Sequence, residues 1–238
     1  MQPRSFDVVC AGAASWTLSS SLRIESGGGA ASVAIAIAMK GLRVGLATSL
    51  ADDTTGRTVL TRLKKANVDT GGVVLIPPRA GLLLLEGDAV VDARPDDTLS
   101  LAIPKGWSAQ VMLLSSLSPL VSQAGAMCKV ARAARRAGSI VVLDIDARWH
   151  LWAGRDARCV RMVLREADVV CAAANDLVAL SMNGAELQRE LRRDGVLLLA
   201  REPMRSDAFV ARVCADLART KAMTPDVWER ALDQGRSQ

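Results

Sequence analysis

Aromatic residues and histidine are scarce in this chain. Only 3% of its 238 residues are aromatic, with two Phe, five Trp and no Tyr. A protein that binds single-stranded nucleic acid by stacking bases needs exposed rings, and the chain has few to offer. The single histidine, His150, argues against a histidine-rich metal site and against a Ser-His-Asp triad. We therefore expect no nucleic-acid partner and no metal site.

Paired cysteines and long apolar runs are also missing. The five cysteines are scattered and never form a C-x-x-C pair, which argues against a disulfide framework and against a zinc site. The longest apolar stretch, residues 30–39, is too short to cross a bilayer, and no signal peptide precedes it. These features predict a cytoplasmic protein in a reducing compartment, without membrane contact.

The chain nevertheless carries abundant small aliphatic residues and a moderate positive charge. Half of the residues are hydrophobic, mainly Ala, Val and Leu, and the net charge is +5. Such a composition suits helices packed closely on a sheet. The excess arginines are spread over stretches with helical character, so we interpret them as solvated helix faces.

Short apolar runs alternate with amphipathic stretches along most of the chain, which predicts repeated strand–helix units and a mostly parallel sheet covered on both faces. The expected strands are 6–12, 43–49, 111–115, 140–145, 168–172 and 196–199. The expected helices are 30–40, 121–137, 156–166, 177–193 and 206–219, with a further helix capped by Thr54 or Thr55.

Residues 71–103 break this alternation. They hold the apolar runs 73–76, 81–85 and 89–91, separated by Pro and Gly turns, a pattern typical of antiparallel hairpins. We interpret 71–103 as a β-flap inserted into a single α/β domain, 1–219, and residues 220–238 as a polar tail. The flap's runs are apolar at consecutive positions, which favours a homodimer formed through it.

Ligands of open parallel sheets bind beyond the carboxyl ends of the strands, so the residues that follow the predicted strands are the candidates. Among them, residues 27–69 (GGGAASVAIAIAMKGLRVGLATSLADDTTGRTVLTRLKKANVD) resemble the N-terminal signature of ribokinase-like, or phosphofructokinase-B type, carbohydrate kinases. The resemblance implies a three-layer, Rossmann-like α/β fold with a flap. It also implies that Gly27 and Gly28 let the backbone approach sugar hydroxyls and that Ser32 faces the sugar.

Three later segments follow the same family pattern in order. Residues 143–152 (LDIDARWHLW) are similar to a D-P-N-Y-R-P-x-L-W motif of kinases that act on keto-sugars and keto-sugar acids, which makes Arg148 a candidate substrate ligand. Asp176 falls on the acidic position of an element that orders magnesium and phosphate. Ser206 and Asp207 match the end of a D-T-x-G-A-G-D-A-F signature, with Asp207 on the catalytic base.

The chain departs from the family where the phosphate would bind. Glycines whose N–H groups hold the transferring phosphate are replaced by Met204, Arg205 and Ser206, and the segment before Asp207 is short. From these departures the sequence favours a degenerate sugar-kinase homologue that binds a sugar-like ligand or a protein partner. An active kinase using Mg-ATP, with Arg205 replacing the glycine loop, is the alternative, and a structural subunit assembled through the flap is a third.

Structural interpretations compete for most of these residues. One alternative is that Asp207 is simply an acidic residue in the first turn of a helix, where its charge is favourable to the helix dipole. Residues 27–29 can likewise form a helix-entry turn without a ligand. Asp52 and Asp53 are typical of helix caps rather than metal ligands. Arg148 can act as an ion-pair partner, and His150 and Trp152 as packing residues.

Overall fold

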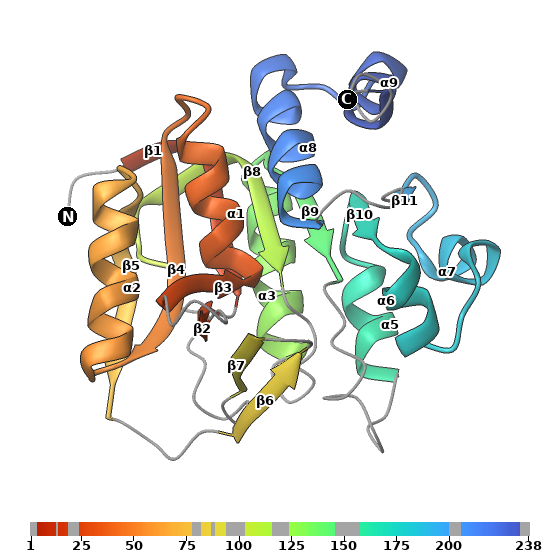
Figure 1. Cartoon of the computed structure of the whole chain (residues 1–238). Coiled ribbons are helices and arrows are strands. Elements are labelled where there is room, and N and C mark those ends of the chain that lie inside the picture. Colours follow the sequence, from red (N-terminus) through yellow and green to blue (C-terminus); the bar gives the residue numbers. More distant parts are fainter. Residues whose placement is uncertain are drawn as a thin grey trace.

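A seven-stranded sheet forms the centre of the fold (Figure 1). The computed structural model describes residues 4–12, 14–18, 24–77, 82–86, 89–93, 103–115, 124–145, 158–199 and 206–233. The strand order is β11-β10-β9-β8-β1-β4-β5, and every neighbouring pair is parallel. The strands are β1 (Arg4–Gly12), β4 (Val44–Ala51), β5 (Asp69–Ile76), β8 (Trp107–Ser115), β9 (Ile140–Asp144), β10 (Val169–Ala172) and β11 (Val196–Leu199).

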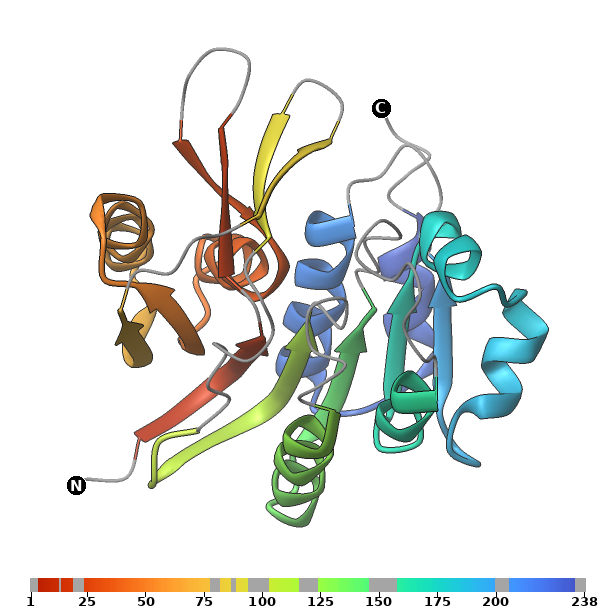
Figure 2. The same cartoon turned by 90° about the horizontal axis from the view of Figure 1, so that it is seen from below.

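Helices cover both faces of this sheet, so the fold has the three layers that the sequence predicts (Figure 2). One core lies beneath α1 (Gly29–Ala38), α2 (Thr54–Lys65) and α8 (Ser206–Thr220), and includes Ile37, Leu63 and Phe209. The other lies beneath α3 (Ala124–Arg136), α5 (Arg158–Leu164) and α7 (Gly184–Glu190), and includes Met127, Leu164 and Leu187. The central strands are buried on both sides, which explains their continuous apolar runs.

A second, antiparallel sheet forms the flap, and its composition differs from the prediction. Its order is β3-β2-β7-β6, with strands β2 (Ala14–Leu18), β3 (Ile24–Gly28), β6 (Leu82–Glu86) and β7 (Ala89–Ala93). The hairpin of β6 and β7 was expected, whereas β2 and β3 were not. The assignment of 73–76 to the flap is wrong, because these residues pair with β4 as the edge strand β5 of the main sheet.

Two other segments also differ from the sequence-based expectation. The single helix expected over 177–193 is divided into α6 (Ala174–Ala179) and α7, because Ser181 adopts a positive φ of 51° and the Asn183 side chain caps α7. Part of the expected polar tail forms α9 (Pro225–Asp233), which packs on α8. Val227 of α9 is fully buried, so these residues form an amphipathic helix with an apolar face rather than the expected polar tail.

Within the described ranges, no helix has the length and the apolar character needed to cross a membrane.

Candidate functional site

The chain reverses its direction of travel across the sheet between β1 and β8. From β1 it passes to β4 and β5 on one side, and it then returns to β8 on the other side and continues to β11. In open α/β sheets such a reversal leaves a crevice at the carboxyl ends of the two strands, where ligands bind. The residues at this crevice are Gly12 and Ser115, which are register partners at the ends of β1 and β8.

The two strand ends lie very close together at this point. Gly12 has a φ of +153°, and a Cβ atom built on it would lie 2.1 Å from the carbonyl oxygen of Ser115. A side chain cannot be accommodated there without moving the backbone, so glycine is required by the approach of β8. Gly12 therefore contributes only backbone to the carboxyl end of β1.

A buried polar pair lies beside this strand end. The Ser115 hydroxyl donates a hydrogen bond of 2.8 Å to Asp144 Oδ2, and the two residues are register partners on β8 and β9. Ser115 is fully buried and Asp144 is 2% exposed. Burial raises the pKa of the neighbouring Cys171 thiol well above its ordinary value, and the negative charges of Asp144 and Asp176 raise it further. Cys171 is therefore a protonated core residue and not a nucleophile.

Helices α1 and α8 both begin at this crevice. They lie side by side, and at their far ends the Arg219 guanidinium donates to the Lys40 carbonyl. With a rise of 1.5 Å per residue, Gly29 is about 16 Å from Lys40 along α1, and Asp207 about 18 Å from Arg219 along α8. Gly29 and Asp207 therefore lie at comparable levels of two adjacent helices, and Figure 1 shows α1 and α8 side by side.

Gly27 and Gly28 end strand β3, immediately before α1, and Gly27 pairs with Ser15 of β2. The flap and the start of α1 thus meet at the diglycine. Ser32 lies in the first turn of α1 and is half-buried. Asp207 lies in the first turn of α8 and is also half-buried. The fold brings the predicted sugar-binding residues and the predicted base to the same end of two adjacent helices.

Asp176 lies at the carboxyl end of β10, in the first turn of α6, and is 5% exposed. Its Oδ2 accepts a hydrogen bond of 2.6 Å from the backbone N–H of Ala173. The carboxylate thus stabilises the start of α6. Asp176 also lies at the same edge of the sheet as Asp144, since both follow the carboxyl ends of neighbouring strands.

The acidic pair after β4 has the structural role that its position favours. Asp53 caps α2, because its Oδ1 accepts from the Gly56 N–H at 2.8 Å and from the Thr55 hydroxyl at 2.6 Å. Asp53, rather than Thr54 or Thr55, is therefore the cap residue. Asp52 forms an ion pair of 2.7 Å with Arg57. Across the described parts of the chain, no group of three or more His, Cys, Asp or Glu residues could hold a metal ion.

Several predicted residues lie outside the described residues: Arg148, Arg205, His150 and Trp152. Ser206 begins α8, but the position of its side chain is not described. Sequence reasoning did not single out Ser115. Its role depends on the register between β8 and β9, and a serine at the end of an apolar strand gives no signal of that register.

The assembled site combines a half-buried carboxylate, two helix N-termini and a close backbone approach. Asp207 can accept a proton from a hydroxyl group held at the crevice. The start of α8 presents backbone N–H groups that have no partner within the helix, and these favour an anion. The arrangement can therefore hold a hydroxyl group and an anionic group side by side at this edge of the sheet, as a transfer from the anionic group to the hydroxyl oxygen requires.

Comparison with known proteins agrees with this geometry. The family profile described as pfkB family carbohydrate kinase matches residues 9–190. A protein named 5-dehydro-2-deoxygluconokinase from Shouchella clausii is 29% identical over 158 residues, which are 58% of this chain and 47% of that protein. One of the same name from Clostridium perfringens is 24% identical over 161 residues, 60% of this chain and 47% of that protein. The match spans about half the length of these curated relatives.

Solved structures of sugar kinases share the fold. A fructokinase with bound ATP from Xylella fastidiosa has a TM-score of 0.74 at 20% identity, covering 91% of this chain and 83% of the fructokinase. An aminoimidazole riboside kinase from Salmonella enterica has a TM-score of 0.73 at 19% identity, covering 96% of this chain and 89% of the kinase. At this level of identity the likeness establishes the ribokinase-like α/β fold.

Proposed function

The chain belongs to the pfkB family of carbohydrate kinases, and on this premise we propose that it transfers the γ-phosphate of ATP to a hydroxyl group of a sugar or keto-sugar acid. The observation that carries the proposal is the convergence of the diglycine at the start of α1 with Asp207 at the start of α8, above the reversal between β1 and β8. The sequence alone favours a degenerate homologue, whereas the family match supports the active kinase, its alternative, better.

Each group at the crevice has a role in such a transfer. Gly27 and Gly28 allow the acceptor to approach the backbone, and Ser32, one turn into α1, can bond one of its hydroxyl groups. Asp207 takes the proton of the acceptor hydroxyl as that oxygen attacks phosphorus. The N–H groups at the start of α8, with Ser206, stabilise the negative charge of the transferring phosphoryl group.

We propose Mg-ATP as the phosphoryl donor. Magnesium keeps several water ligands and binds mainly through the phosphates and one or two carboxylates, so it needs no protein cage. Asp176 lies along the same edge of the sheet and can bond water in that shell. Magnesium bound to the phosphates neutralises charge during the transfer. Arg205 precedes α8 directly and can contribute a positive charge at the same place.

The substrate class follows from the relatives and from one arginine. The matching curated proteins are named as kinases of 5-dehydro-2-deoxygluconate, a keto-sugar acid. Arg148 follows β9 by four residues, and its planar guanidinium can bind a carboxylate in two places. We propose a keto-sugar acid as the acceptor and Arg148 as the residue that recognises its carboxylate.

The test is turnover with Mg-ATP and a panel of sugars, keto-sugars and sugar acids. We expect Asp207→Asn to lower kcat by about 10²- to 10⁴-fold, because it removes the base. Asp216→Asn is the matched control: it lies on the same helix and carries the same change, and among the described residues its carboxylate pairs with Arg219 at the far end of α8, so turnover should be unchanged. Equal activity of both variants would reject Asp207 as the base.

A degenerate homologue remains the competing function because of one sequence feature. Met204, Arg205 and Ser206 stand where the family's glycines expose N–H groups to the phosphate, and side chains there restrict the approach. Calorimetric titration with Mg-ATP separates the two: micromolar affinity supports the kinase. Sugar binding without nucleotide binding supports the degenerate homologue.

We also propose that two copies associate through the flap. Strand β6 carries Leu83 and Leu85 among consecutive apolar residues, and the alternation of strand residues predicts apolar positions on both faces of the hairpin, of which only one can cover the crevice. Leu83→Glu with Leu85→Glu should convert a dimer to a monomer in light scattering without unfolding the α/β body. A wild-type monomer at tens of micromolar would exclude the dimer, and would leave a different protein partner as the flap's occupant.

A further inference from the structure

Six basic side chains gather at the end of the sheet opposite Asp207. They are Lys40 after α1, Arg62, Lys64 and Lys65 in the last turn of α2, Lys105 in the turn before β8, and Lys221 after α8. In a parallel sheet every helix returns the chain to the end where the strands begin, so these dispersed positions lie at the same edge of the sheet. Figure 1 shows the three helices α1, α2 and α8 that carry or precede most of them. We call this group the basic end.

Contacts tie the basic end into one surface. Arg219 of α8 donates to the Lys40 carbonyl, which brings Lys221 close to the end of α1. The Arg4 N–H donates to the Gly106 carbonyl, which places Lys105 beside the start of β1. Helix α2 packs on β4, α1 packs on β4 and β1, and α8 packs on β1, so the three helices cover the same face of the sheet.

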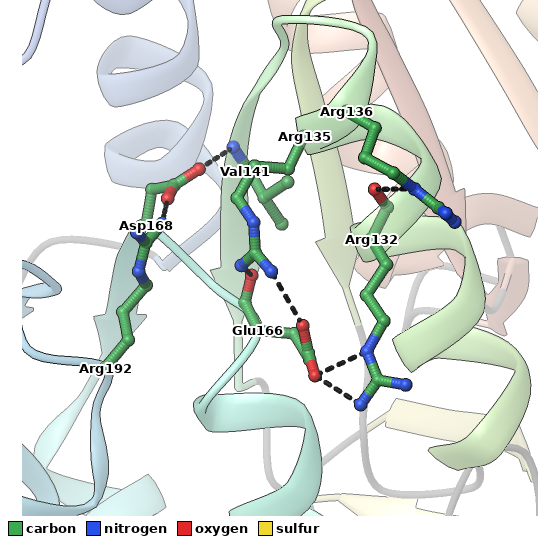
Figure 3. Close-up of polar contacts among 7 residues, drawn as sticks. All are labelled: Arg132, Arg135, Arg136, Val141, Glu166, Asp168 and Arg192. Carbon is green, nitrogen blue, oxygen red and sulfur yellow. Dashed lines mark hydrogen bonds and ion pairs between the residues drawn. The ribbon is translucent and has the colours of Figure 1, made fainter.

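Carboxylates at this end of the sheet are already paired with other arginines. Asp69 pairs with Arg4, and Asp7 with Arg43. Glu166 and Asp168 bind arginines of α3 and of the turn before β11 (Figure 3). Asp194, and Asp226 and Glu229 of α9, are exposed carboxylates nearby.

The six side chains of the basic end are not held in ion pairs. Within the described residues, none of them forms a salt bridge, and all except the half-buried Arg62 are exposed. Part of this arrangement is explained by the preference of lysine and arginine for helix C-termini. Lys105 lies in a turn that follows no described helix, and the six unpaired cations outnumber the exposed carboxylates of α9, so a net positive potential remains at this end.

The kind of anion that suits this surface follows from what surrounds the charges. Helices end here, so they present backbone carbonyl groups, which repel phosphate. Nucleic-acid phosphates are commonly bound by backbone N–H groups at helix N-termini, and those lie at the other end of the sheet. Trp107, two residues after Lys105, is half-buried with its ring packed on Phe6 and against Gly45 and Gly72, so this ring is not an open stacking platform for bases. Met39, next to Lys40, is 81% exposed and supplies an apolar side chain instead. Dispersed cations beside an apolar side chain are typical of contact with the headgroups of anionic lipids.

We propose that the basic end docks the protein on an anionic phospholipid surface, with the crevice at Asp207 facing away from the lipid. The sequence led us to expect no membrane contact, because its longest apolar run is too short to cross a bilayer. Peripheral attachment needs no such run. The cations are far apart along the chain, and the parallel topology brings them to one edge of the sheet. Attachment of this kind is peripheral and electrostatic, and it leaves the substrate crevice open to solvent.

Sedimentation with vesicles tests the proposal on the whole chain. The protein should bind vesicles of phosphatidylcholine mixed with phosphatidylserine and should not bind phosphatidylcholine alone. Because each cation near an anionic bilayer contributes about 1 kcal/mol, Lys64→Gln with Lys65→Gln should weaken binding by roughly 30-fold. The control, Lys129→Gln with Arg189→Gln, removes the same charge from exposed positions on α3 and α7 and should leave binding nearly unchanged. Added salt should release the wild type.

Three outcomes would overturn the proposal. Equal binding to both kinds of vesicle would show that charge does not drive attachment. An equal loss in the control pair would show that total charge, and not the basic end, is responsible. Binding of a double-stranded oligonucleotide at the same salt, without vesicle binding, would assign the basic end to nucleic acid. Unfolding midpoints of both variants establish that each remains folded.

Discussion

The hydroxyl of Ser115 donates a 2.8 Å hydrogen bond to the carboxylate of Asp144, and neither residue has appreciable exposure. A hydrogen bond to a buried charged group contributes about 1.5–3 kcal/mol. Ser115→Ala should therefore lower the free energy of unfolding by this amount in urea titration. Ser139 is the matched control, because its hydroxyl donates 2.6 Å to the neutral carbonyl of Ala109. Ser139→Ala should cost about 1 kcal/mol, and a larger loss than in Ser115→Ala would contradict the prediction.

Gly12 offers a second test of the crevice. An added Cβ would lie 2.1 Å from the Ser115 carbonyl oxygen at a φ of +153°, so Gly12→Ala must separate β1 from β8. We expect a loss of about 2 kcal/mol or more, measured by urea unfolding. Gly125→Ala is the control, because no neighbouring atom lies within 4 Å of the new Cβ on α3. That change should raise stability by about 0.5–1 kcal/mol.

Asp53 and Asp52 provide a contrast between a cap and an exposed ion pair. Asp53→Ala removes an acceptor for the Gly56 N–H and should cost about 1 kcal/mol. Asp52→Ala breaks the ion pair with Arg57, in which the Asp52 side chain is 41% exposed and the Arg57 side chain 66% exposed. The free energy of unfolding should therefore change by about 0.5 kcal/mol at most. Thermal unfolding of both variants gives the comparison. A larger effect of Asp52→Ala would indicate a function for that residue beyond its ion pair.

The sequence predicts most of the central sheet because each strand there is buried on both faces. The expected strands 140–145, 168–172 and 196–199 are short apolar runs between turns, and their limits agree with β9, β10 and β11 to within one residue. By contrast, β2 and β3 have the mixed sequences ASWTL and IESGG, with no clear period. They become strands by pairing with each other and, through β2, with β7, a partner distant in sequence.

The candidate site was predictable only where it lies at strand ends and follows the family pattern. Asp207 and the diglycine both satisfy that condition. Ser115 does not, because its hydrogen bond depends on the register of β8 with β9. Residues 73–76 show the same limit: their apolar run is equally consistent with a flap strand and an edge strand, and only the pairing with β4 decides.

Glu166 makes stability depend on pH through its two arginines. It is held between Arg132 and Arg135 of α3, with Arg132 Nε donating 2.7 Å to Oε1 and Arg135 Nη2 donating 3.1 Å to Oε2 (Figure 3). The Arg132 hydrogen bond and the positive charges of both arginines hold the pKa of Glu166 below its ordinary value of 4.5, although partial burial acts in the opposite direction. The folded state therefore binds the Glu166 proton less readily than the unfolded chain does.

A carboxyl group whose pKa is lowered by folding stabilises the protein above its unfolded pKa, and this contribution is lost as the pH falls through the folded pKa. At pH 7 we expect Glu166→Gln to lower the free energy of unfolding by about 1–3 kcal/mol, because two arginines lose a charged acceptor. The difference from wild type should persist down to about pH 5 and shrink steadily below pH 4.5.

Arg132→Gln should reduce the wild-type pH dependence, because it removes the largest cause of the lowered pKa. Arg136→Gln is the control on the same helix, since Arg136 donates only to the Arg132 carbonyl, and it should leave the dependence intact. Urea unfolding of the four proteins between pH 3 and pH 7 measures these free energies. If the difference in the free energy of unfolding between wild type and Glu166→Gln does not change with pH, the carboxylate is not held by its arginines.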